Sequence, residues 1–268
     1  MEKILCTVEI LTRNSARTLG RCLGSVKDFD EIIILDGNST DNTRQIAERF
    51  GCKIIKQYDT DEPSITIKDY AEVRNKGLAL AKHDWFMYID SDEYLSSEVA
   101  EEIREIVTSP NPSVHAYWQP RKYMLDGKVI DCATTYPNQQ MRLFHRQHIN
   151  KFIRSIHERI ELKPETKTGF LKHFEYVPVE ELAELEARWG RYMKKEIEML
   201  DGVGKKKLLR LAARYIALFC LYTFRYIRNL IACRGNKMPL RFEIARHKYL
   251  LLLSIHLLKK FITGIRSL

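Results

Sequence analysis

The chain has 268 residues, 45% of them hydrophobic and 29% charged, so it can bury the core of one α/β domain and still carry a helical appendage. Its cysteines, at positions 6, 22, 52, 132, 220 and 233, form no Cys-x-x-Cys pair. That scatter argues against a zinc site or a disulfide scaffold and fits a reducing cytosol. An apolar strand begins within three residues of the N-terminus, so we expect no signal peptide.

Over the first 90 residues, short apolar runs alternate with amphipathic segments. Asn14 or Ser15 caps the first predicted helix, and Gly51 ends the second. The alternation predicts a mostly parallel sheet covered on both faces by helices. Neither a dinucleotide-binding glycine fingerprint nor a P-loop sequence occurs. The predicted order is strand 4–11, helix 16–26, strand 31–35, helix 43–50, strand 52–57, helix 69–81 and a strand from residue 85.

The strand at 85–89 runs directly into three acids, Asp90, Asp92 and Glu93. Acids at the end of a buried strand lie at the carboxyl edge of the sheet, where open α/β sheets bind ligands. Asp90 and Asp92 can converge on one hard cation, Mg²⁺ or Mn²⁺, which bridges readily to phosphate oxygens. The sequence therefore predicts a metal-held substrate that contains phosphate. An Asp-x-Asp triplet by itself also occurs in surface turns and helix N-caps.

The C-terminal part is strongly basic. Residues 188–268 hold 19 Lys and Arg and 4 Asp and Glu, a net of +15; since the whole chain carries +9, residues 1–187 carry −6. This part contains two apolar runs, and neither exceeds about ten residues. A helix that spans a bilayer needs ~20 apolar residues. We expect helices that lie on an anionic membrane surface. Packing against the α/β domain stays open, and nucleic acid is not an expected partner because no nucleic-acid module is present.

The predicted helices of this part are amphipathic. When one of these helices is wound at 100° per residue, five of its basic side chains fall within about 60° of one another around the helix axis and form a stripe. A second predicted helix, 242–265, has an apolar run at 249–258. The stripe consists of Lys207, Arg210, Arg214, Arg225 and Arg228, and the opposite apolar surface of Leu209, Ala213, Ile216, Phe219, Cys220, Thr223 and Ile227.

Four motifs in order resemble the family 2 glycosyltransferases of GT-A fold: Thr12-Arg13-Asn14, the Asp36-to-Thr43 turn, Arg74-Asn75 and the acidic strand end at 90–93. More narrowly, Arg142-Leu143-Phe144, Ile156-His157-Glu158 and an isolated His173 resemble bacterial transferases that add a hexose, often glucose, to the lipopolysaccharide inner core. The resemblance covers about residues 3–200. Glu9 departs from it, because the family usually has an aliphatic residue at that place.

The resemblance implies an α/β, GT-A Rossmann-like domain at 1–178, with a nucleotide-sugar half (1–95) and an acceptor half (96–178), followed by a basic helical tail (179–268). In the acceptor half, Asp126-Gly127 is a strong type I′ hairpin signal between strands 117–125 and 128–132, and 141–144 is a further strand. The implied reaction is inverting transfer of a hexose from a UDP-sugar to a lipopolysaccharide core or similar membrane glycolipid. The enzyme would lie peripherally on the cytoplasmic face of the inner membrane.

Site roles follow from the same resemblance. Asp36 recognises the uridine, Thr12 and Asn14 form the opposite wall of the nucleotide pocket, and Arg74 holds the nucleotide or diphosphate. Glu93 orients the donor sugar or the metal shell.

The acceptor side has its own candidates. Glu158 is the expected base, with His157 orienting it or touching the sugar. His173 is a candidate third metal ligand, although an isolated histidine is more often structural. Asp131 and Glu161 are the next candidates for the base.

Three alternatives stay open. The acceptor could be another lipid-linked molecule or a protein. A sugar nucleotidyltransferase is disfavoured, because the turn after the first strand, 12–17, is not glycine-rich. A membrane-binding protein with an inactive GT-A domain would explain the tail and leave the acids without a task.

Overall fold

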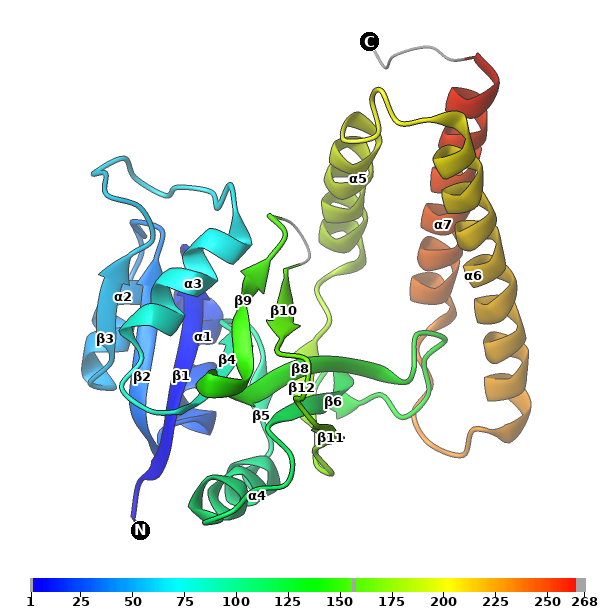
Figure 1. Cartoon of the computed structure of the whole chain (residues 1–268). Coiled ribbons are helices and arrows are strands. Elements are labelled where there is room, and N and C mark those ends of the chain that lie inside the picture. The colour runs from blue at the N-terminus through cyan, green and yellow to red at the C-terminus, as the bar shows by residue number, and fades with distance from the viewer. Residues whose placement is uncertain (1, 156–157, 264–268) are drawn as a thin grey trace. The chain divides into compact units, whose positions relative to one another are not determined.

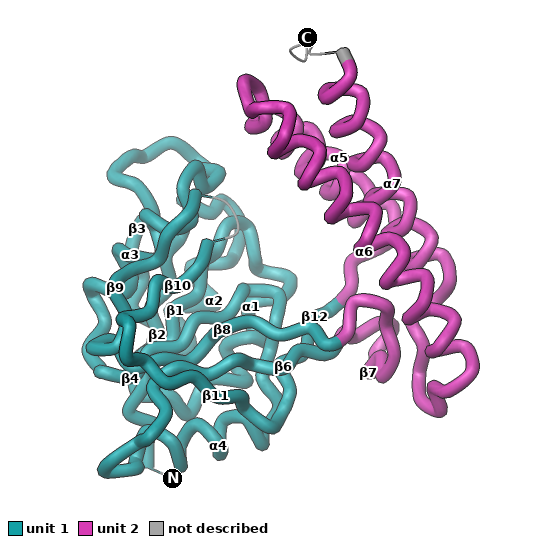
Figure 2. Tube along the Cα trace, turned by 45° about the vertical axis from the view of Figure 1, so that its right-hand side comes forward, with its two compact units in different colours: residues 1–122, 137–178 teal, residues 123–136, 179–268 magenta. Residues whose placement is uncertain are grey.

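The computed structural model describes residues 2–155 and 158–263. The chain divides into two compact units, shown in different colours in Figure 2. Unit 1 comprises residues 1–122 and 137–178, and unit 2 comprises residues 123–136 and 179–268. The sequence predicts that residues 123–136 belong to the acceptor half, 96–178, of the α/β domain. The structure groups them with the C-terminal helices instead.

Unit 1 is built on a sheet whose strands follow the order β3-β2-β1-β4-β8-β6-β12-β5, with β7 and β11 also paired to β6. β9 and β10 form a separate pair. Most of the elements are labelled in Figure 1, and β7 is labelled in Figure 2. In chain order they are β1 (Ile4–Thr12), α1 (Ala16–Ser25), β2 (Phe29–Asp36), α2 (Thr43–Arg49), β3 (Lys53–Lys56), α3 (Tyr70–Leu80), β4 (Trp85–Asp90), β5 (Tyr94–Leu95), α4 (Ser97–Thr108), β6 (Ala116–Leu125), β7 (Lys128–Val129), β8 (Asn138–His145), a 3₁₀ turn (Arg146–His148), β9 (Ile149–Ile153), β10 (Arg159–Leu162), β11 (Thr168–Phe170) and β12 (Glu175–Pro178).

The sheet is mixed, with a parallel part built from the first four strands and an antiparallel part added beside it. β3, β2, β1 and β4 are parallel, as the strand–helix alternation predicted. β8 runs antiparallel to its two neighbours, β4 and β6. The reason is the connection between β6 and β8, which contains a hairpin and no crossover helix.

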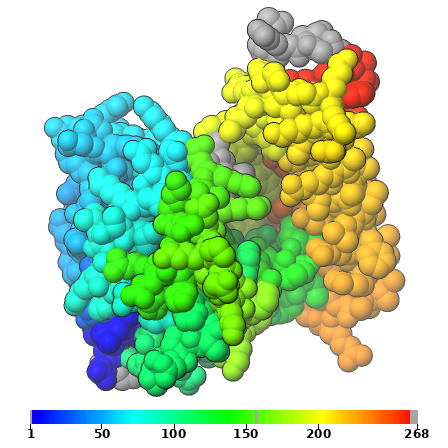
Figure 3. Space-filling model, viewed as in Figure 1, coloured from blue at the N-terminus to red at the C-terminus, as the bar shows by residue number. Residues whose placement is uncertain are grey.

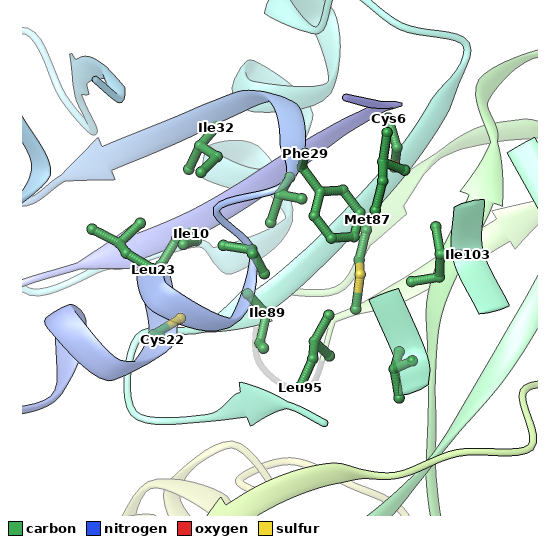
Figure 4. Packing of buried hydrophobic residues seen from close by; sticks show 14 of the residues in the cluster. Cys6, Ile10, Cys22, Leu23, Phe29, Ile32, Met87, Ile89, Leu95 and Ile103 are labelled. Atoms are coloured by element: carbon green, nitrogen blue, oxygen red, sulfur yellow. The ribbon is translucent and has the colours of Figure 1, made fainter. Parts of the chain in front are cut away.

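Side chains alternate across the sheet and divide the core into two layers. On one face, Ile10 of β1 and Met87 of β4 pack with Leu23 of α1 and Ile103 of α4, as Figure 4 shows. On the other face, Val73 of α3 packs with Leu11 of β1 and with Leu35 of β2. Residues 7, 9 and 11 of β1 and residues 86, 88 and 90 of β4 therefore share the face that α3 covers.

Unit 2 consists of the hairpin end of β6 and β7 together with α5 (Leu182–Glu198), α6 (Lys205–Ala232) and α7 (Leu240–Thr263). Asp126 and Gly127 have φ values of 49° and 73°, which confirms the type I′ turn. α6 and α7 pack through Leu208 and Ala212 on one helix and Leu253 and Leu257 on the other. Across the described ranges, no helix is both long enough and apolar enough to cross a membrane.

A disulfide joins Cys132, after the hairpin, to Cys233, after α6, across 101 residues of sequence. The expectation that no disulfide forms is therefore wrong for this pair. Spacing could not reveal it, because hydrogen bonds that link residues far apart in the sequence bring the two segments together. Asp131 N donates to the Asn236 carbonyl at 2.8 Å, and Thr134 N donates to Glu243 Oε1 at 3.0 Å.

Cys132→Ser is expected to lower the free energy of unfolding of unit 2 by ~2–4 kcal/mol, because the bridge closes a long loop and so restricts the unfolded chain. Thermal unfolding of the oxidised protein checks this, with reductant expected to give the same shift in the unaltered protein. Cys220→Ser is the matched control, since Cys220 is an exposed free thiol. An unchanged midpoint in Cys132→Ser would contradict the expectation.

Candidate active site

The loops after β1 and β2 form one wall of the site. The Asp36 carboxylate accepts hydrogen bonds from Thr12 Oγ1 at 2.8 Å and from Ser39 N at 2.9 Å and Ser39 Oγ at 2.6 Å. Asp36 and Thr12 are buried. The structure thus brings the two predicted nucleotide residues together, with their side chains bonded to each other and to the loop that follows β2.

Asn14 links this wall to a third loop. Its backbone has a φ of 50°, a left-handed conformation that asparagine tolerates better than most residues. Its Oδ1 accepts from Thr40 N at 2.8 Å, and its Nδ2 donates to Ser64 Oγ at 3.1 Å. The exposed Asn14 is therefore the junction of three loops at the carboxyl edge of the parallel strands.

Asp90, at the end of β4, lies between two buried arginines. Arg74 Nη2 of α3 donates to its Oδ1 at 3.0 Å, and Arg142 Nη2 of β8 donates to its Oδ2 at 2.9 Å. Both guanidinium groups also lie over the Tyr88 ring, 4.5 and 4.6 Å from its centre. Burial raises the pKa of Asp90, but Arg142 and Arg74 outweigh it and hold that pKa well below its usual range. The side chain is nevertheless 42% exposed, so the ionised carboxylate can be reached from solvent.

A second ion-pair group lies behind Asp90. Arg142 contacts Glu93, and its Nη2 lies 3.2 Å from Glu175 Oε1 of β12. Arg121 of β6 also contacts Glu93. Burial first, and then the neighbouring Glu175, raise the pKa of Glu93 well above its usual range. Glu93 is buried and paired with arginines, and its role in orienting the donor sugar or the metal shell stays a prediction.

Arg74 is the centre of the site. It is 1% exposed, and its guanidinium faces three carboxylates, on Glu9, Asp90 and Glu158. The predicted role was to hold the nucleotide or diphosphate. In this structure its donors face carboxylates of the protein, and contact with the nucleotide or diphosphate stays a prediction.

Glu158 is brought to the same place. Its Oε1 lies 3.5 Å from Arg74 Nε, and its side chain is 14% exposed. Ile156 and His157 lie outside the described residues, so the role of His157 stays a prediction. Glu158 immediately precedes β10, and Glu161, the next candidate for the base, lies on that strand and pairs in register with Lys151 of β9. Asp131, the other candidate, belongs to unit 2.

The predicted metal ligands are only partly brought together. Asp92 follows Asp90 and is half-buried. His173 is exposed; its backbone N donates to Glu102 of α4 at 3.3 Å, and it is one of the groups that lower the pKa of Glu98. In the described part of the chain, no three His, Cys, Asp or Glu side chains form a group that could hold a metal ion. His173 therefore does not join Asp90 and Asp92 in such a group.

Sequence reasoning missed several members of the cluster. Arg142 belongs to a motif that was noted, without a role, and Glu9 was noted only as a departure from the family. Arg121 and Glu175 carried no signal, because their ionic partners are distant in the sequence: Arg121 of β6 contacts Glu93, and Glu175 of β12 lies beside Arg142 of β8. A buried arginine inside an apolar strand is the one signal that could have pointed to Arg142.

The mixed sheet, the helices on both its faces and the polar groups at the carboxyl edge of its parallel strands agree with the GT-A fold of glycosyltransferases. The sequence profile of glycosyl transferase family 2 matches residues 7–171, more than half of the chain. The chain therefore belongs to glycosyl transferase family 2.

Curated relatives match part of the chain. An uncharacterized glycosyltransferase of Rickettsia felis is 37% identical over 120 residues, which cover 44% of this chain and 39% of that protein. A TPR repeat-containing protein of Synechococcus elongatus is 32% identical over 154 residues, covering 57% and 34%. The SPbeta prophage-derived glycosyltransferase SunS of Bacillus subtilis is 32% identical over 145 residues, covering 46% and 32%. The matched part is thus between about a third and two fifths of these relatives' length.

Solved structures resemble the chain more distantly. Residues 1–349 of TarS from S. aureus give a TM-score of 0.47 at 14% identity, covering 99% of this chain and 92% of that one. Glucosyl-3-phosphoglycerate synthase from Mycobacterium tuberculosis, solved with Mn²⁺, uridine diphosphate and glucosyl-3-phosphoglycerate, gives a TM-score of 0.32 at 22% identity, covering 46% and 44%. Likenesses of this degree carry no argument about substrate.

Proposed function

We propose that the protein is an inverting glycosyltransferase that moves a hexose, preferably glucose, from a UDP-sugar to a lipopolysaccharide core or a similar membrane glycolipid. One observation supports the reaction class above all others. Arg74 joins Asp90, at the strand end where a nucleotide diphosphate is expected, to Glu158, the proposed base. Family membership supports the same class.

Asp90, an ionised carboxylate that stays accessible to solvent, fits a ligand of a divalent cation, Mg²⁺ or Mn²⁺. The cluster holds more carboxylates than guanidinium groups, and Asp90 keeps an accessible side chain although two arginines bind it. Asp90 and Asp92 would hold the cation, with diphosphate oxygens and water supplying its other ligands. When bound, the cation would neutralise charge on the leaving diphosphate. The carboxylates are Glu9, Asp90, Glu93, Glu158 and Glu175, and the guanidinium groups belong to Arg74, Arg121 and Arg142.

Glu158 would act on the acceptor. Inverting transfer needs a group that takes the proton of the acceptor hydroxyl as that oxygen attacks the anomeric carbon from the face opposite the diphosphate. Glu158 retains exposed surface, and Arg74 limits its movement by an ion pair. Thr12, Asp36 and Asn14 would form the wall for the uridine, through the loops that they fix.

The charges and the apolar surface of unit 2 favour attachment to an anionic membrane. α6 contains seven Lys and Arg and no Asp or Glu. Along its length, side chains at three- and four-residue spacing form an outward apolar stripe next to exposed Arg210, Arg214 and Arg228. Figure 3 shows α6, gold to orange, at the surface of unit 2. The apolar stripe consists of Leu209, Ala213, Ile216, Cys220, Phe224, Ile227 and Ile231.

Arg225 does not belong to the exposed basic stripe as predicted, because its Nη1 donates to the Thr134 carbonyl at 3.2 Å within unit 2. The rest of the stripe, Lys207 included, is exposed. An apolar stripe beside exposed cations fits the boundary between headgroups and acyl chains. We place the protein on the cytoplasmic face of the inner membrane. The Cys132–Cys233 disulfide gives this placement a check, because a reducing cytosol would tend to open it.

Replacing Arg210, Arg214 and Arg228 with Gln is expected to weaken binding to vesicles that contain phosphatidylglycerol about a hundredfold, since each charge near such a surface contributes ~1 kcal/mol. Co-sedimentation at low and high salt measures it. The matched control removes three exposed charges from unit 1, at Lys27, Arg49 and Lys163. Equal loss in both variants, or no loss in the first, would contradict a specific role for α6.

The proposed reaction is tested by incubating the protein with a panel of UDP-sugars and extracted lipopolysaccharide precursors in Mn²⁺. A hexose mass shift on the acceptor, with release of UDP, is the expected result. Release of pyrophosphate from a nucleoside triphosphate would point to the nucleotidyltransferase instead. Neither transfer nor hydrolysis of any UDP-sugar would favour an inactive domain that only binds membranes.

A further inference from the structure

Glu9 is a fully buried acid in the middle of β1, the central strand of the parallel part of the sheet. In the sheet its neighbours across the backbone are Ile33 on β2 and Tyr88 on β4. Burying a carboxylate costs several kcal/mol unless it is well paired. An aliphatic side chain would serve the strand better, so the acid must be explained by what it contacts.

Its contact is Arg74. Glu9 Oε1 accepts from Arg74 Nη1 at 2.9 Å, and both side chains are almost completely buried. The other oxygen, Oε2, has no hydrogen-bond partner among the described residues. Burial raises the pKa of Glu9 to about 7 in spite of Arg74. The pairing is therefore poor as a stabilising device, because one oxygen is left unsatisfied.

Gly77 makes this contact possible. It lies one turn after Arg74 on α3, where the helix crosses β1. A Cβ atom at position 77 would lie 1.9 Å from Glu9 Oε2 and 2.9 Å from Leu35 Cδ1. Only a glycine lets α3 come this close to the strand while the Glu9 side chain stands between them. The helix and the strand are thus fitted to each other around the carboxylate.

We propose that Glu9 is a positioning residue for sugar transfer, which anchors Arg74 from inside the sheet so that one guanidinium holds Asp90 and Glu158 in a fixed relation. Each guanidinium nitrogen of Arg74 faces a different carboxylate: Nη1 faces Glu9, Nη2 faces Asp90 and Nε faces Glu158. Without the anchor, the guanidinium can rotate toward either remaining carboxylate and release the other. This inference depends on the proposed function.

Glu9→Leu removes the anchor, and Glu9→Gln keeps an oxygen that can accept from Arg74. In transfer assays, Glu9→Leu is expected to lower kcat by ~10- to 100-fold, with the acceptor KM changed less than about twofold, because alignment of the reacting groups is lost and acceptor binding is not. Glu9→Gln is expected to keep most of the kcat of the unaltered protein. Thermal unfolding of each variant shows whether the folded fraction is the same.

Thr7→Val is the matched control. Thr7 lies two residues earlier on β1, on the same face, and donates to Glu31 at 2.6 Å rather than to the cluster. Thr7→Val should keep the kcat of the unaltered protein.

Gly77→Ala tests the same contact from the helix. As a single substitution, it should lower kcat because the added Cβ displaces Glu9. When it is added to a Glu9→Ala variant, it should have a much smaller effect on kcat, because the carboxylate is already gone.

Full kcat in a folded Glu9→Leu variant would overturn the positioning role. A kcat loss in Glu9→Leu that Thr7→Val matches, with the same fall in melting temperature, would also overturn it, because a general loss of packing would then suffice. Both results require an active unaltered protein. An unaltered protein without any turnover contradicts the proposed function itself, so the two failures are distinguishable.

Discussion

Asp90→Asn is expected to abolish sugar transfer, with a loss of about 10³-fold or more, the equivalent of several kcal/mol of transition-state stabilisation. Asparagine keeps the shape of the side chain but removes the negative charge that would hold the cation. Chelation of the unaltered protein by EDTA should produce a similar loss. Transfer of labelled hexose measures both effects.

The fold should survive this change. Arg74 keeps Glu9, and Arg142 keeps Glu93 and Glu175, so neither guanidinium is left buried without a carboxylate. Asp84→Asn is the matched control, since Asp84 immediately precedes β4 at its opposite end and pairs with Arg146 at 3.9 Å. Activity of Asp90→Asn that persists in EDTA would refute the metal assignment.

Glu158→Gln is expected to lower turnover by ~10²- to 10⁴-fold, because the amide cannot take the acceptor proton. Donor affinity should change little, since the diphosphate side of the site is untouched. Rapid-quench transfer and equilibrium binding of UDP separate the two quantities.

The control for the base is Glu161→Gln, three residues further along the chain on β10. A loss of less than tenfold in Glu158→Gln would place the base elsewhere, and a large loss in Glu161→Gln would identify that residue instead. Equal loss in both variants with weaker UDP binding would indicate damage to the β9–β10 pair rather than removal of a base.

The local elements of unit 1 could be predicted because their signals are local. β1, β2 and β4 are apolar runs bounded by polar turns, and α3 begins at Asp69, whose side chain accepts from Glu72 N. The placement of Asp90 at the carboxyl edge followed from the order of these elements. Nothing beyond hydrophobic periodicity and capping was needed.

The ion-pair cluster could not be predicted in the same way. Glu93 meets Arg142 across 49 residues of sequence, and only the antiparallel order of β4, β8 and β6 brings them together. That order is set by non-local pairing, on which short sequence patterns carry little information. For the same reason the Cys132–Cys233 pair was missed.

The way the two units alternate along the chain determines how the protein responds to truncation and to proteolysis. Residues 137–178 of unit 1 lie inside the loop that Cys132–Cys233 closes. A fragment that starts at residue 179 lacks the hairpin and Cys132, and a fragment that ends at residue 178 leaves that cysteine without its partner. A protease that cuts between residues 137 and 178 would accordingly yield two pieces that migrate as one until the disulfide is reduced.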